Sequence, residues 1–273
     1  MSWLDRYNKN KQKLIDANLY DPMQEHDACG VGFIASIDGK PNRRVVTSGI
    51  EALKAVWHRG AIDADGKTGD GAGIHIEIPK AFFEEEIKKT GHEMMQGDLG
   101  MGMIFLPRND YSALEKCRTI VESELIDHGY FIYGWRQVPV DTSVIGKKAN
   151  MTRPEIEQVM FVNNKERSEK EDLDKELFLI RRRIEKRILK IQISDFYICS
   201  LSFKSVIYKG LFLAEELEVF YPDLQDKNFV SSFAIFHQRY STNTFPSWAL
   251  AQPFRALAHN GEINTISGNS NWM

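Results

Sequence analysis

The sequence has few cysteines, and their arrangement excludes several classes of protein. Only three occur in 273 residues, Cys29, Cys117 and Cys199, and no C-x-x-C pair is present. An odd number of widely spaced cysteines is not a disulfide framework, and the seven histidines show no H-x₃-H spacing. We therefore expect no bound metal and a reducing, cytoplasmic setting.

The sequence also lacks long apolar runs and a marked excess of one charge. No stretch is apolar enough over a sufficient length to cross a bilayer, and the opening residues contain no signal-peptide core. The net charge is only −3, so we expect neither a nucleic-acid nor a membrane partner. With 42% hydrophobic and 27% charged residues, the composition is typical of a soluble globular protein.

The sequence does contain many short strands with helices between them. Alternation of Val31, Phe33 and Ala35 predicts the first strand, and Ser48 with Glu51 resembles the capping box of a following helix. There is no regular alternation of strand and helix, so we expect an α+β fold with largely antiparallel sheets. The predicted strands are 31–37, 73–79, 101–107, 130–140, 195–203, 206–209, 229–237 and 253–258, and the predicted helices are 48–60, 110–129 and 163–190.

Two short segments carry possible reaction chemistry. Cys29 precedes the first strand, where a cysteine is usually a small buried hydrophobe, although it could also be a nucleophile. Asn260 and Gly261 form an Asn-Gly pair, which is a common turn. The same pair can supply an amide side chain and a backbone N–H that converge on one oxyanion.

A third segment, HQRYSTNTFPSW at 237–248, groups polar side chains after an apolar strand. Arg239 offers a planar fork suited to a carboxylate, and Thr242 and Asn243 add directed donors. The alternative is an ordinary polar loop. The glycine-rich stretch at 57–74 is not predicted to bind a nucleotide, because a strand follows it where such a loop requires a helix.

Taken in order, these segments resemble the class II glutamine amidotransferases, whose nucleophile is the first residue of the mature chain. The matching blocks are CGVGFIASIDGKP, GIEALKAVWHRGAIDADGKTGDGAGIHIEIP, RYSTNTFPSW and HNGEINT, and the match is closest to the domain found in glutamate synthases. The resemblance implies a four-layer αββα sandwich of the N-terminal-nucleophile (Ntn) hydrolase type. It also implies that residues 1–28 are a propeptide, that 29–273 form the amidotransferase domain, and that this domain is truncated at the C-terminus and continues beyond 273.

The resemblance further assigns roles to individual residues. Cys29 would attack the side-chain amide of glutamine, with Asn260 and Gly261 stabilising the oxyanion. An α-amine has a pKa of about 7.7–8.0 and a free thiol about 8.5, so the freed amine of Cys29 can serve as its base. Among the substrate-binding residues, Arg239 would bind the α-carboxylate, with Thr242 and Asn243 nearby and Arg59 close to the nucleophile.

Further expectations concern the rest of such an enzyme. No cofactor is expected within this chain. FMN and an iron–sulfur cluster are implied in downstream domains of the same polypeptide, where ammonia would react with 2-oxoglutarate. The electron donor is left open between NADPH, through a small subunit, and ferredoxin. The remaining alternatives are a non-catalytic module of the same fold and another class II amidotransferase.

Overall fold

The computed structural model describes residues 3–18, 21–23, 30–163, 173–238, 245–255 and 273. It divides the chain into two compact units. The smaller combines Met1–Cys29 with Ala258–Met273, and its described residues contain one helix, α1 (Trp3–Asp16). The larger runs from Gly30 to Leu257 and contains all other described elements.

The larger unit is built on two four-stranded sheets in which every paired neighbour is antiparallel. The first sheet has the order β1-β8-β2-β7, and its strands are β1 (Val31–Ala35), β8 (Phe233–Gln238), β2 (Ala72–Glu77) and β7 (Ser205–Gly210). The second has the order β4-β5-β3-β6, with β4 (Phe131–Gln137), β5 (Glu155–Asn163), β3 (Asp98–Leu106) and β6 (Tyr197–Ser202). The described helices of this unit are α2 (Arg43–Ala55), α3 (Lys80–Lys89), α4 (Tyr111–Asp127), α5 (Lys147–Met151), α6 (Leu173–Lys190) and α7 (Leu217–Phe220), with 3₁₀ turns η1 (Trp57–Arg59), η2 (Thr142–Val144), η3 (Ala214–Glu216) and η4 (Pro222–Gln225).

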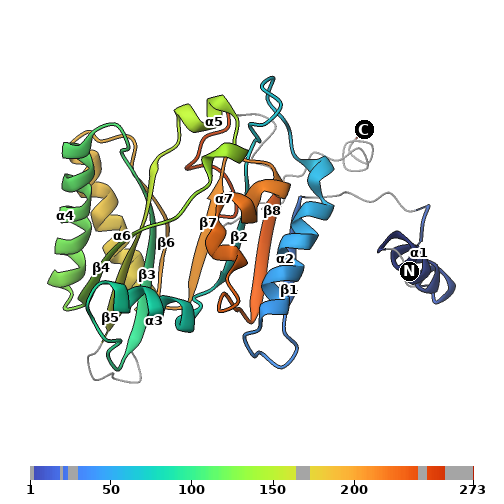
Figure 1. Ribbon diagram of the computed structural model, residues 1–273, viewed down its shortest axis with the longest axis horizontal. Coiled ribbons are helices and arrows are strands. Elements are labelled where there is room, and N and C mark those ends of the chain that lie inside the picture. The colour runs from blue at the N-terminus through green and yellow to red at the C-terminus, as the bar shows by residue number, and fades with distance from the viewer. Residues whose placement is uncertain (1–2, 19–20, 24–29, 164–172, 239–244, 256–272) are drawn as a thin grey trace. The chain divides into compact units, whose positions relative to one another are not determined.

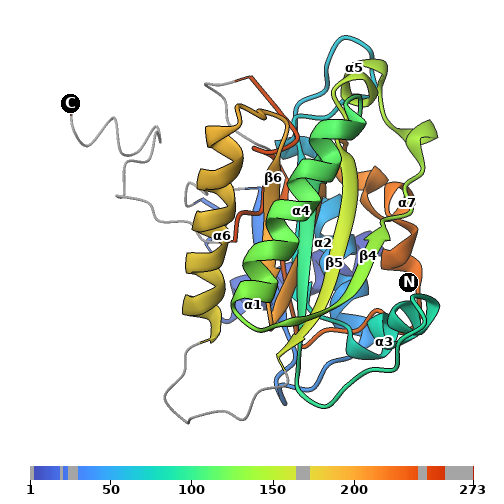
Figure 2. The ribbon, with the colours of Figure 1, turned by 90° about the vertical axis from the view of Figure 1, so that its left-hand side faces the viewer.

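Helices flank the two sheets on opposite sides. In Figure 1, α4 and α6 lie on the left, the second and first sheets follow, and α2 lies on the right; Figure 2 views the unit from the side of α4 and α6. The apolar stripe of α6, including Ile180 and Ile184, is fully buried in a cluster with Phe161 of β5. On the other side, Gly49 of α2 lies so close to the first sheet that a Cβ there would be 2.8 Å from that of Ala234. This α+β arrangement agrees with the expected αββα sandwich.

The start of α2 differs from the sequence prediction. Ser48 and Glu51 do not form a helix start, because α2 begins at Arg43 and both residues lie inside it. The helix is capped by Asn42, whose Oδ1 accepts a hydrogen bond of 3.1 Å from the backbone N–H of Val45. The predicted capping box is therefore wrong, since a Ser-x-x-Glu spacing also occurs within helices.

Other predicted elements are confirmed with changed bounds. Asp110 caps α4 as expected, accepting from the N–H of Ala113 at 2.9 Å. The helix predicted over 163–190 is confirmed over Leu173–Lys190 as α6, and 164–172 lie outside the described residues. The strand β5, over Glu155–Asn163, was missed by the sequence reading, and Asn163 belongs to it and not to the helix. The predicted strand at 253–258 is not a strand over its described residues, 253–255.

The first strand is confirmed, but its apolar alternation faces solvent. Val31 and Phe33 are 48% and 65% exposed, whereas α2 packs over β1 and β8 on the opposite face. On that face, Gly32 is held against the ring of Phe236, since a Cβ at Gly32 would lie 2.2 Å from the ring. The inner face of β1 thus carries Gly32 and the half-buried Ile34, which packs against the core.

A buried ionic network ties the sheets to the segment after α7. Arg136 of β4 donates to both carboxylate oxygens of Asp223 at 2.7 Å and to Glu86 at 2.8 Å. Tyr208 of β7 donates to Asp223 at 2.9 Å and accepts from Gln158 of β5 at 2.8 Å. Burial alone would lower the pKa of Arg136, but its interactions with the carboxylates outweigh burial and raise the pKa.

Among the described residues, no helix has the length and apolar character needed to cross a membrane.

Candidate active site

The residue that follows Cys29 in the sequence is held in a narrow space. Gly30 accepts a hydrogen bond of 2.6 Å from the backbone N–H of Gln238, the last residue of β8. A Cβ at Gly30 would lie 2.1 Å from the carbonyl oxygen of Gln238 and 3.4 Å from the Cβ of Arg59. Only glycine fits this close approach of three chain segments. The start of β1, the end of β8 and the turn η1 therefore meet at Gly30.

Two buried polar atoms at this point have no hydrogen-bond partner among the described residues. They are Nε of Arg59, a donor, and Oε1 of Gln238, an acceptor. The Gln238 side chain is also fixed in place by Gly60, where a Cβ would lie 2.0 Å from its Nε2. Because unpaired buried polar groups are costly, a donor and an acceptor left open together are typical of a place where a polar ligand binds.

The glycine-rich stretch next to Arg59 forms a small hairpin. The N–H of Asp70 donates to the carbonyl of Ala61 at 3.1 Å, and the N–H of Ala61 donates to Oδ1 of Asp70 at 3.0 Å. The N–H of Asp63 donates to the carbonyl of Thr68 at 2.8 Å. At its tip, hydrogen bonds from Thr68 lower the pKa of Asp65. The strand β2 then begins at Ala72, which confirms that no helix follows these glycines. The hairpin is thus a rigid support for η1.

The chain beyond the polar segment 239–244 is anchored by Trp248. Its indole is 4% exposed, and Nε1 donates to the carbonyl of Ala149 at 3.0 Å. Its ring packs against Phe105, Phe212 and Phe220. The described residues on both sides of 239–244 are therefore held firmly, at Gln238 by β8 and at Trp248 by the core.

The two described cysteines are poor nucleophiles. Cys117 and Cys199 are buried, and desolvation raises the pKa of Cys117 to about 11 and that of Cys199 to about 12. A thiol reacts as its thiolate, so both are expected to be inert at neutral pH. Of the three cysteines in the sequence, Cys29 alone remains a candidate nucleophile.

Most of the predicted site residues lie outside the described residues. These are Cys29, Arg239, Thr242, Asn243, Asn260 and Gly261, and their assignments remain predictions. Arg59 is described, and its Cβ lies 3.4 Å from a Cβ placed at Gly30; its role near the nucleophile remains a prediction. Gln238 was not singled out from the sequence. It follows Ala234 and Phe236 on the buried side of β8. A glutamine at a position where the strand pattern calls for an apolar residue was the sequence signal that could have identified it as a candidate site residue.

This geometry and the comparisons with known proteins define the class of protein. Residues 29–273 match the family of class II glutamine amidotransferases, and the chain belongs to this family.

Within this family, three similar relatives are all named glutamate synthases. The chain is 63% identical over 267 residues to the glutamate synthase [NADPH] large chain of Azospirillum brasilense, covering 98% of this chain and 18% of the relative. It is 45% identical to the ferredoxin-dependent glutamate synthase of Pyropia yezoensis over 92% of this chain, and 43% identical to ferredoxin-dependent glutamate synthase 1 of Arabidopsis thaliana over 94%. It covers 16% of each of these two relatives. The chain thus spans less than a fifth of the proteins it matches.

Proposed function

We propose that this chain performs the glutaminase half-reaction of a glutamate synthase, hydrolysing glutamine to glutamate and ammonia at Cys29. The observation that carries the proposal is the family match, which begins at this cysteine and runs to residue 273. All three relatives above are named glutamate synthases, which favours this enzyme over other class II amidotransferases.

The reaction follows from the thiol and amine of one residue. The sulfur of Cys29 attacks the side-chain amide carbon of glutamine, and Asn260 with the N–H of Gly261 stabilises the oxyanion. The α-amine of Cys29 takes the thiol proton and passes it to the departing ammonia. Water then hydrolyses the thioester and releases glutamate.

The described residues support this site in two ways. Gly30, which follows Cys29 in the sequence, is clamped between Gln238 and Arg59, and these two residues carry an open acceptor and an open donor. The Nε of Arg59 suits an anionic group, and the Oε1 of Gln238 suits an N–H of the substrate or of the free amine. Arg239, Thr242 and Asn243 complete the substrate site in this proposal, with Arg239 on the α-carboxylate.

Removal of residues 1–28 is part of the proposal. While Cys29 is joined to Ala28, its nitrogen is an amide and cannot accept the thiol proton. The family match starts at Cys29, which is where such a cleavage would leave the new chain end. Residues 1–28 are accordingly interpreted as a propeptide.

The remaining steps belong to the whole polypeptide, since the relatives are more than five times as long as this chain. Ammonia would pass to 2-oxoglutarate in a downstream domain, where FMN and an iron–sulfur cluster supply the reducing electrons. The higher identity to the NADPH-named relative favours NADPH, through a small subunit, over ferredoxin. The cytoplasmic setting remains a prediction from cysteine usage.

The proposal is tested by comparing chains that begin at Met1 and at Cys29. Ammonia release from glutamine is expected only from the chain beginning at Cys29, and Cys29→Ser should abolish it. Alkylation followed by mass spectrometry should modify Cys29 and spare Cys117 and Cys199, and glutamine should slow the modification.

Two results would refute the proposal. One is full turnover with Met1 still attached. The other is labelling of Cys29 that saturating glutamine does not affect, which would favour a non-catalytic module.

A further inference from the structure

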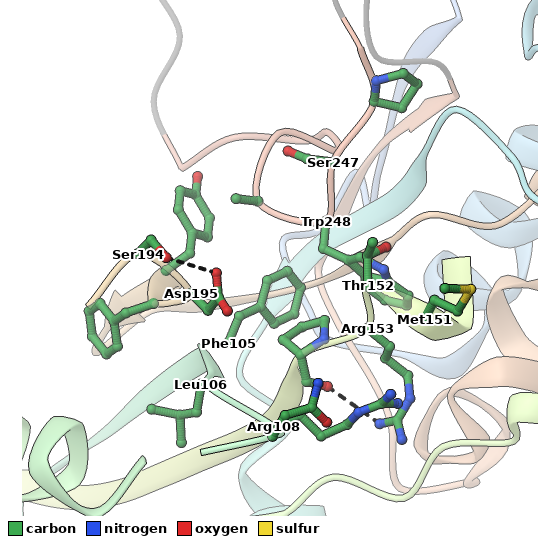
Figure 3. A pocket seen from close by; sticks show the side chains of 16 residues that line it. Phe105, Leu106, Arg108, Met151, Thr152, Arg153, Ser194, Asp195, Ser247 and Trp248 are labelled. Carbon is green, nitrogen blue, oxygen red and sulfur yellow. Dashed lines mark hydrogen bonds between the residues drawn. The ribbon is translucent and has the colours of Figure 1, made fainter. Parts of the chain in front are cut away.

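A cavity of about 480 Å³ lies at the end of β3. Four segments of the larger unit line it: the end of β3, the turn after α5, the residues leading into β6, and 246–249. Figure 3 shows the lining side chains. Gly30, Arg59 and Gln238 are not among the lining residues. The volume of the cavity falls in the range of small-molecule sites.

Two arginines on one side of the cavity, Arg108 and Arg153, form only long hydrogen bonds within the described part of the chain. Nη1 of Arg108 and Nε of Arg153 both lie 3.5 Å from the same acceptor, Oδ1 of Asn150. Arg153 also donates to the carbonyl of Pro154 at 3.4 Å. These distances are at the long limit for hydrogen bonds. In Figure 3 the two side chains lie next to each other.

Among the described residues, neither arginine forms an ion pair with a carboxylate. Other arginines of the chain do form such ion pairs. Nη1 of Arg136 lies 2.7 Å from a carboxylate oxygen of Asp223, and Nη1 of Arg187 lies 2.8 Å from one of Glu124. Burial and then the charge of Arg108 lower the pKa of Arg153, and Glu155 only partly offsets this. Two neighbouring cations with a shared weak acceptor are stabilised by an added anion.

Aromatic rings also line the cavity. Phe105 stands edge-on to Trp248 with ring centres 6.0 Å apart, and its centre is 6.3 Å from that of Tyr197. Nζ of Lys209 lies 4.5 Å and Cζ of Arg255 lies 5.4 Å from the ring centre of Tyr197. The charge of Arg255 is partly balanced by Glu185, whose Oε1 lies 3.6 Å from Nη2 of Arg255.

One acidic residue, Asp195, lines the cavity. It is exposed and accepts a hydrogen bond of 3.1 Å from Ser194. In Figure 3 it lies on the other side of Phe105 from the two arginines. The arginine side of the cavity therefore keeps its positive charge.

We propose that this cavity binds a small organic oxyanion, with its carboxylate or phosphate group on Arg108 and Arg153 and a flat apolar body against Phe105 and Tyr197. The guanidinium forks match both kinds of oxyanion, and the aromatic walls supply the surface that buries the body. The proposal does not depend on the glutaminase activity.

The test measures binding of inorganic phosphate, phenyl phosphate and benzoate to the chain by titration calorimetry. Phenyl phosphate should bind about tenfold more tightly than phosphate, because the aromatic walls bury its ring. The double variant Arg108→Gln/Arg153→Gln should weaken phenyl phosphate binding at least tenfold, and Arg153→Lys should have an intermediate effect. Arg44→Gln is the matched control, since Arg44 is exposed on α2 and does not line the cavity. The ratio of benzoate to phenyl phosphate affinity then decides between a carboxylate and a phosphate ligand.

Thermal unfolding provides a second readout that also reports folding. Phenyl phosphate should raise the unfolding temperature of the wild type and of Arg44→Gln but not that of the double variant. Without ligand, the double variant should unfold at a temperature no lower than the wild type, since the repulsion between the two cations is gone. No binding of any probe, equal binding to the double variant, or an equal loss in Arg44→Gln would each overturn the proposal.

Discussion

Replacing Gly30 by alanine would disturb the point where β1, β8 and η1 meet. The new Cβ would lie 2.1 Å from the carbonyl oxygen of Gln238, which is 0.9 Å short of the 3.0 Å that real Cβ atoms need. The obstacle is backbone in a paired strand, so β1 and β8 must separate by about that amount. A displacement of about 1 Å at a reacting group can cost roughly 10²-fold in rate. The stability cost of such overpacking is about 1–3 kcal/mol.

A second glycine with a similarly short contact separates the two effects. A Cβ at Gly100 of β3, in the second sheet, would lie 2.2 Å from the ring of Phe161, a buried side chain, whereas the obstacle at Gly30 is backbone. Both variants, Gly30→Ala and Gly100→Ala, should lose stability in urea unfolding. Ammonia release by the chain beginning at Cys29 should fall about 10²-fold for Gly30→Ala and much less for Gly100→Ala, with each rate measured well below the unfolding midpoint.

The comparison has a clear refuting result. If Gly30→Ala retains the wild-type rate, or if both variants lose activity in proportion to their stability, the clamp at Gly30 does not position the nucleophile. The reasoning that links Gly30 to Cys29 would then be wrong, whatever the identity of the enzyme.

Three further predictions concern the core, the pH dependence and the oxyanion. Arg136→Met should lower the free energy of unfolding by about 3–5 kcal/mol, because it leaves Asp223 buried without its cation and leaves Glu86 with Lys89 alone. The exposed pair broken by Arg182→Met should cost less than about 1 kcal/mol in the same urea titration. Burial lowers the pKa of His75 from 6.5 to about 4, so between these values the unfolded state binds the extra proton and the stability falls as the pH falls. From pH 7 to pH 4 the wild type should lose about 3 kcal/mol more than His75→Gln, and equal losses would contradict the burial argument. Asn260→Ala should lower kcat roughly 10²-fold or more with little change in KM, and an unchanged kcat would reject its role at the oxyanion.

Local patterns predicted the elements whose signals lie within a few residues. The alternation at β1 and β2 and the Asp110 cap of α4 are signals of this kind, and the structure confirms them. The capping-box reading of Ser48 failed because Asn42, earlier in the chain, already starts the helix. β5 was missed because it precedes a highly charged stretch, and its identity as a strand depends on pairing with β3 and β4.

The candidate site was assigned from motifs and resemblance, not from periodicity, and most of its residues lie outside the described part of the chain. Arg59 is described and lies beside Gly30, while its role near the nucleophile stays a prediction. The open acceptor on Gln238 depends on how β8 and Gly60 enclose that side chain, which is a tertiary contact that no local pattern encodes. The same holds for Arg108 and Arg153, which become neighbours only after folding.

The position of β1 at the margin of its sheet bears on how such an enzyme can mature. Every ladder partner of β1 is in β8, near the opposite end of the sequence, and the last link joins Gly30 to Gln238. Among the described residues, β1 therefore draws none of its pairing from the part of the chain that precedes it. The proposed cleavage before Cys29 would accordingly leave all of these β1–β8 hydrogen bonds in place.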